Sequence, residues 1–70
     1  MAWWFGFRQV EPRPPGRGVG CGPYQTREDA HQRRLVEVRN WDAAVSEPFE
    51  AQNQEEADQI AELRTPGRAT

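Results

Sequence analysis

Apolar and polar residues alternate along residues 2–10, and this alternation is typical of a β-strand. One face of the expected strand carries three large aromatic residues, Trp3, Phe5 and Phe7. The other face carries Trp4, Gly6, Arg8 and Val10. We expect the three aromatic residues to build the core. Trp4 lies out of phase with them, and we expect it either to be half covered by a loop or to be exposed for a partner.

Residues 11–18 break this pattern and predict a loop with polyproline character. Its prolines fix φ and remove backbone donors, and its glycines permit positive φ. A short second strand follows over residues 18–24, with Val19 and Cys21 on one face. We expect it to return antiparallel to the first strand.

A helix is predicted from Thr26 to about residues 39–40. Thr26 with Asp29 three positions later fits a capping box in which Asp replaces the usual Glu. The i, i+4, i+7 spacing of an apolar stripe is met by three residues, His31, Leu35 and Val38. We expect this stripe to be buried.

A third strand is predicted over residues 41–51, and Pro48 should place it at a sheet edge or in a bulge because proline cannot donate to a ladder. Asn53 with Glu56 is a second capping-box pattern and opens a second helix, which ends at Thr65. The apolar side of this helix comprises Ala57, Ile60, Ala61 and Leu63. Residues 66–70 are expected to form a flexible tail.

These elements predict one α+β domain over residues 1–70, in the order ββαβα. We expect a three-stranded, mainly antiparallel sheet with both helices on one face and the other face partly open. A chain of 70 residues makes at most one domain. It buries only about 60% of the surface that its unfolded chain exposes, so its stability is small.

The composition limits the cellular compartment and the kind of partner that we expect. Cys21 is the only cysteine, which excludes an internal disulfide and favours a reducing compartment. No apolar run approaches the roughly 18 residues of a membrane span, and the apolar start lacks the basic region of a signal peptide. The net charge of −2 argues against a general nucleic-acid binder. We expect an intracellular protein.

The sequence offers no catalytic or metal-binding group. Cys21 and His31 could act as a nucleophile pair only with an orienting third group, and none is evident. We expect His31 to pack against the sheet. The acidic pairs at residues 28–29 and 55–56 suit helix N-termini. The alternating glycines of residues 16–22 are not followed by the Lys and Ser or Thr of a phosphate loop. We therefore expect no enzyme activity, cofactor or metal.

Two strings resemble phrases of known proteins. Gly-Pro-Tyr-Gln-Thr-Arg-Glu-Asp-Ala at residues 22–30 resembles a strand-to-helix phrase of small uncharacterised proteins of actinobacteria and their phages. Val-Ser-Glu-Pro-Phe at residues 45–49 resembles a second phrase of the same proteins. A similar turn occurs in the SPOR domains that bind peptidoglycan glycan strands. The resemblance implies a host-directed accessory protein or a virion component, and it supplies no functional residues.

We expect the binding surface to comprise Trp4, Arg8, Arg13 and Arg17, because Trp and Arg are enriched at interface hot spots. Trp3, Trp4 and Trp41 remain open as core or interface residues. The leading hypothesis is a non-enzymatic protein-binding accessory module, in the host cytoplasm or a virion, that docks on a larger host or virion protein. The alternatives are a capsid decoration protein and a glycan- or nucleic-acid-binding module. Self-association is left open.

Overall fold

The structure, a computed structural model, describes residues 1–39 and 42–67. Its elements in chain order are β1 (Ala2–Gln9), β2 (Val19–Tyr24), α1 (Arg27–Glu37), β3 (Ala43–Val45), β4 (Phe49–Ala51) and α2 (Gln54–Arg64). Trp41 and residues 68–70 of the expected tail lie outside the described residues.

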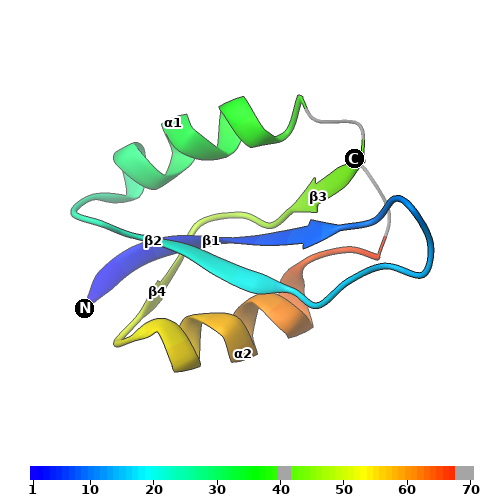
Figure 1. Cartoon of the computed structure of the whole chain (residues 1–70). Helices are drawn as coiled ribbons and strands as arrows, with labels where there is room; N and C mark the ends of the chain where they lie inside the picture. Colours follow the sequence, from blue (N-terminus) through cyan, green and yellow to red (C-terminus); the bar gives the residue numbers. More distant parts are fainter. Residues whose placement is uncertain (40–41, 68–70) are drawn as a thin grey trace.

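The sheet is antiparallel and centred on β1, as Figure 1 shows. β2 pairs with one edge of β1, and β3 and β4 both pair with its other edge. Val45 of β3 lies opposite Phe7, and Phe49 of β4 lies opposite Trp4. The third strand expected from the sequence is therefore divided in two, with Pro48 between the parts. The mixed α+β class is confirmed, as is the edge position of the segment around Pro48, but the single strand expected over residues 41–51 is wrong.

The two helices lie on opposite faces of the sheet, with α1 above it and α2 below it in Figure 1. Successive residues of β2 face α1 and α2 in turn. Gly20 lies against Ala57 of α2, whereas Cys21 lies within electrostatic range of Arg33 and Glu37 of α1. The expectation that both helices share one face is therefore wrong. β1 carries apolar residues on both faces, and each face is covered by a helix.

Each face of β1 buries one large aromatic side chain. Trp4 is only 3% exposed and packs in a cluster with Phe49, Ala51 and the two α2 alanines, Ala57 and Ala61. On the other face Phe5 is 1% exposed, and its ring stacks on that of Tyr24. Phe5 fulfils its predicted role in the core. Trp4 does not lie exposed, because α2 covers the face that was expected to be open.

Closely packed glycines explain how α2 approaches the sheet. A Cβ atom added to Gly18 would lie 2.7 Å from the carbonyl oxygen of Ala61, and one added to Gly20 would collide with the side chain of Ala57. Gly22 has a φ of +152°, which L side chains rarely adopt. Gly18 and Gly20 therefore leave a surface without side chains on which Ala57 and Ala61 of α2 pack.

Both helix starts follow the predicted capping chemistry. The Thr26 hydroxyl accepts from the backbone amide of Asp29 at 3.1 Å, and the Asn53 side chain accepts from that of Glu56 at 2.8 Å. Each bond satisfies an N–H group that has no partner inside the helix. The first helix ends at Glu37, slightly before the predicted end.

α1 turns a different stripe toward the sheet from the one predicted. Ala30 is fully buried and Arg34 is largely buried. Leu35, by contrast, is exposed, and the rest of the predicted stripe, His31 and Val38, is only half-buried. The helix is therefore rotated so that Leu35 faces away from the sheet.

Candidate partner-binding groove beside α2

An open groove of about 510 Å³ lies on the outer side of α2, where the loop between β1 and β2 approaches the helix. Its lining is Arg17, Glu55, Asp58, Gln59, Glu62 and Leu63. We call these six residues the α2 groove. All but Arg17 come from α2, so a regular helix fixes the positions of most of the lining.

Polar side chains on one stripe of α2 hold this helix against β2 and the residue that precedes it. The Asp58 carboxylate accepts from the Gly20 backbone N–H at 2.8 Å, and the Glu62 carboxylate accepts from the Gly18 backbone N–H at 2.5 Å. Gln54 donates to the Gly20 carbonyl at 2.8 Å. Residues 54, 58 and 62 are four apart and therefore lie on one helix face. They satisfy backbone groups along an edge strand that would otherwise need other partners.

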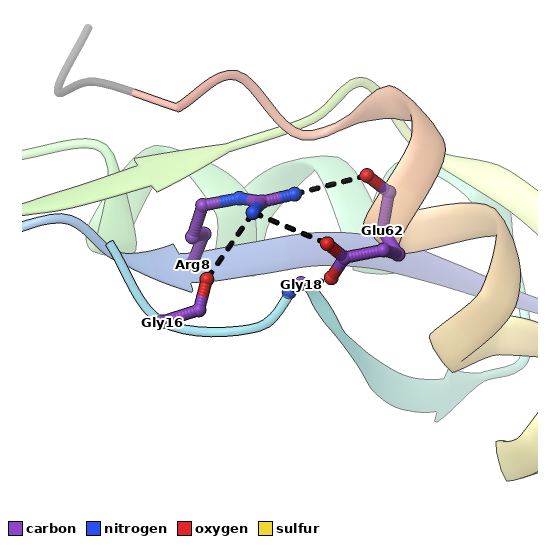
Figure 2. Close-up of polar contacts among 4 residues, drawn as sticks. All are labelled: Arg8, Gly16, Gly18 and Glu62. Carbon is purple, nitrogen blue, oxygen red and sulfur yellow. Dashed lines mark hydrogen bonds and ion pairs between the residues drawn. The ribbon is translucent and has the colours of Figure 1, made fainter. Parts of the chain in front are cut away.

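Arg8 fastens the loop to the helix, as Figure 2 shows. Its guanidinium donates to the Gly16 carbonyl at 3.1 Å and to the Glu62 carbonyl at 2.9 Å, and it pairs with the Glu62 carboxylate at 3.4 Å. The side chain is only 12% exposed. Arg8 is therefore committed to intramolecular contacts and positions the loop on one side of the groove.

The two carboxylates of the stripe are held in their ionised form. The hydrogen bond from the Gly20 amide, followed by that from Gln54, lowers the pKa of Asp58. The hydrogen bond from the Gly18 amide lowers the pKa of Glu62, and the positive charges of Arg8 and Arg17 act in the same direction. The groove therefore stays acidic.

The remaining lining residues are available to a partner. Leu63 is 88% exposed at the groove although it lies in a helix whose alanines are fully buried. Glu55 and Gln59 are exposed, and the side chain of neither makes a hydrogen bond or ion pair within the part of the chain that the structure describes. The groove thus offers one large apolar side chain beside uncommitted polar groups.

The lowered pKa values predict a loss of stability in acid. A carboxyl whose pKa is lower in the folded state adds stability above its unfolded pKa and loses it as the pH falls through the folded value. For Asp58 and Glu62 the loss begins below their ordinary values of 3.8 and 4.5. Urea unfolding at a series of pH values should show the midpoint falling over this range.

The neutral variants Asp58→Asn and Glu62→Gln test this assignment. Together they should flatten the pH dependence of the urea midpoint below about pH 4.5, because two groups that bind protons on unfolding are gone. Glu50→Gln, at an exposed residue of β4, is the matched control and should leave it unchanged. A double variant with the steep pH dependence of the wild type would contradict the role of the two carboxylates.

The structure separates the four residues predicted to bind a partner. Trp4 is buried under α2, and Arg8 is tied to Glu62 and the loop. The exposed Arg13 forms an ion pair with Glu11 at 3.7 Å. Of the four, only Arg17 lines the α2 groove. A joint surface of Trp4 and Arg8 is therefore wrong, and stacking of Trp4 on a sugar or base is excluded by its burial.

The acidic lining from α2 was not predicted from the sequence, although a signal for it was present. Asp58 and Glu62 follow Gln54 at intervals of four, and the facing strand alternates Gly18, Gly20 and Gly22. A polar helix stripe next to a strand face that carries only glycines indicates that the helix side chains reach the strand backbone. Leu63 was expected on the buried side of α2 and is instead the apolar residue of the groove.

Residues 1–39 and 42–67 were also examined for a reactive cysteine, a metal site and a membrane-spanning helix. Burial raises the pKa of the Cys21 thiol, so the thiolate that a nucleophile needs is disfavoured. No group of three or more His, Cys, Asp or Glu side chains in this part of the chain could hold a metal ion. No described helix is both long enough and apolar enough to cross a bilayer.

A scan of protein-family models, a search of curated proteins and a search of solved structures each found no match to this chain.

Proposed function

We propose that this protein is a non-enzymatic protein-binding module whose partner binds in the α2 groove. The exposure of Leu63 beside an acidic, concave surface carries this proposal. A large apolar side chain at the C-terminal end of a helix adds nothing to the core of this domain when it is 88% exposed. Binding would remove it from water, which is favourable by roughly 25 cal/mol for each Å² of apolar area.

The lining also defines the chemistry of the partner. Glu55, Asp58 and Glu62 outnumber the single cation Arg17. A segment that carries an apolar side chain flanked by Arg or Lys would cover Leu63 and place positive charge near the carboxylates. Guanidinium groups suit this role because they donate in pairs to carboxylates. We therefore propose a basic, partly apolar protein segment as the partner.

A peptide selection tests the proposal with random sequences in place of a natural partner. Peptides displayed on yeast are selected on the wild-type protein at low salt, and the enriched sequences are synthesised. They should combine an apolar residue with flanking Arg or Lys. Leu63→Glu and Glu55→Arg should each weaken their binding by about tenfold or more, since either change removes a central contact.

Glu50→Arg provides the matched control, because Glu50 is an exposed glutamate outside the groove. It makes the same charge change as Glu55→Arg and should leave peptide affinity nearly unchanged. Circular dichroism should report a folded domain for all three variants. Enriched peptides that bind Leu63→Glu as tightly as the wild type would refute the proposed site.

A further inference from the structure

The outer face of α1 carries apolar residues that the fold leaves exposed. Val36 is 56% exposed and Leu35 is 39% exposed. They project on the side of α1 opposite the buried Ala30, with Gln32 between them on the helix surface. An amphipathic helix ordinarily turns such residues toward its core. In α1 the positions that face the sheet include the charged residue Arg34 instead.

Specific bonds fix this inverted orientation. Arg34 donates to the Ser46 carbonyl at 2.9 Å and to the Glu47 carboxylate at 3.2 Å, so the charged side chain reaches over β3 toward the segment that leads to β4. Rotating Leu35 and Val36 inward would break both bonds. The exposed pair is therefore a stable feature of α1.

The same face has charges of opposite sign at its two ends. Glu28 and Asp29 lie in the first turn, and Arg39 follows the last turn. The side chains of Asp29 and Arg39 are exposed and make no ion pair within the described part of the chain. The face has acidic groups at one end and a basic group at the other. Two copies of this face packed antiparallel would therefore place opposite charges next to each other.

We propose that the outer face of α1 is the interface of a homodimer in which two copies of α1 pack antiparallel. A two-fold axis that crosses the outer face of α1 at the level of residue 34 would pair Asp29 of each copy with Arg39 of the other. It would also bring Val36 of each copy to Gln32 of the other, next to both Leu35 side chains. Isologous pairing of this kind is the commonest form of protein oligomer. The antiparallel arrangement also aligns the two helix dipoles favourably.

The proposed dimer would not obstruct the α2 groove. α1 and α2 lie on opposite faces of the sheet, so two copies joined through α1 would present their grooves on the two outer sides (Figure 1). Such a dimer could bind two segments at once, and the second binding event would gain from the raised local concentration. The dimer and the groove are nevertheless independent proposals, because different residues carry them.

Sedimentation equilibrium at low salt over a wide concentration range tests the dimer with a charge-swap design. The wild-type mass should rise with concentration from one copy toward two. Asp29→Arg and Arg39→Asp should each weaken dimerisation by about tenfold, since each substitution acts twice in a symmetric interface. The double variant Asp29→Arg with Arg39→Asp should return to within about threefold of the wild type.

Three further variants make the result unambiguous. Val36→Asp should abolish the dimer while circular dichroism shows a folded chain. Glu50→Arg, a matched charge reversal away from α1, should leave the dimer unchanged. Leu63→Glu should also leave it unchanged, and it thereby separates the dimer from the groove. A wild type that stays monomeric at millimolar concentration, or a charge-swapped double variant as weak as its single parents, would overturn the proposal.

Discussion

Replacing Trp4 with alanine is expected to lower the free energy of unfolding by about 3–5 kcal/mol. The indole lies in the α2 cluster with Phe49, Ala51, Ala57 and Ala61, and its N–H donates to the Ala51 carbonyl at 3.1 Å. Truncation would leave a cavity between the sheet and α2. A domain of this size has a total stability of roughly 3.5–10 kcal/mol, so the variant should be largely unfolded or close to it at room temperature.

Urea unfolding followed by circular dichroism measures this loss. Trp4→Phe is the control that retains most of the buried ring and removes the hydrogen bond to Ala51. It should cost about 1–3 kcal/mol, well below the alanine variant. If Trp4→Ala unfolds at the same urea concentration as the wild type, the indole lies outside the core and α2 does not cover that face of β1.

Phe5→Ala should be as damaging on the opposite face, with a loss of about 3–5 kcal/mol. Phe5 lies under α1, and its ring centre is 6.2 Å from that of Tyr24 in a stacked arrangement. The measurement is the same urea titration, with Gln25→Ala, at an exposed residue just before α1, as the control that should change stability by less than about 0.5 kcal/mol. Coincident unfolding curves for Phe5→Ala and the wild type would show that α1 does not pack on this face.

The two alanine variants together test the layered arrangement. Phe5 and Trp4 are adjacent in β1 and point to opposite faces. A sheet with one open face would lose much stability from only one of the two substitutions. Large losses from both require a helix on each side, as Figure 1 shows.

Local sequence signals predicted much of this fold. The strand over residues 2–10, the loop at residues 11–18 and both helix caps rest on near neighbours in the chain. Thr26 and Asn53 bond amides three residues ahead, so the sequence alone contains both partners of each bond. The expected edge or bulge at Pro48 is equally local, since it follows from the missing N–H of proline.

The side of the sheet on which each helix packs depends on distant residues, and it could not be read from local pattern. Trp4 was out of phase with three aromatic residues, which favoured an exposed position. Its burial depends on Ala57 and Ala61, more than fifty residues later in the chain. Likewise, the rotation of α1 depends on Arg34 bonding to Ser46. Helical periodicity indicates a stripe, but such long-range bonds decide which stripe is buried.

The binding site was predicted least well, for a related reason. Arg8 lies just before the loop of residues 11–18 and Arg17 lies near its end, so the two look equivalent in the sequence. Glu62, far along the chain, bonds directly to Arg8 and leaves Arg17 at the groove. The helix dipole accounts only for the acidic pair at residues 55–56. The contacts of Glu62 with Gly18 and of Asp58 with Gly20 emerge only when α2 and β2 are placed together.

An NMR titration tests most directly whether the α2 groove is the binding site. Amide proton–nitrogen spectra of the uniformly labelled protein are recorded with increasing amounts of a selected peptide. The amides of Gly18 and Gly20 donate to Glu62 and Asp58, so a ligand on those carboxylates should shift both signals. The amide signal of Gln32 on α1 should not shift. Shifts that cluster on α1 or on β3 and β4, with the two glycine signals unmoved, would contradict the proposed function.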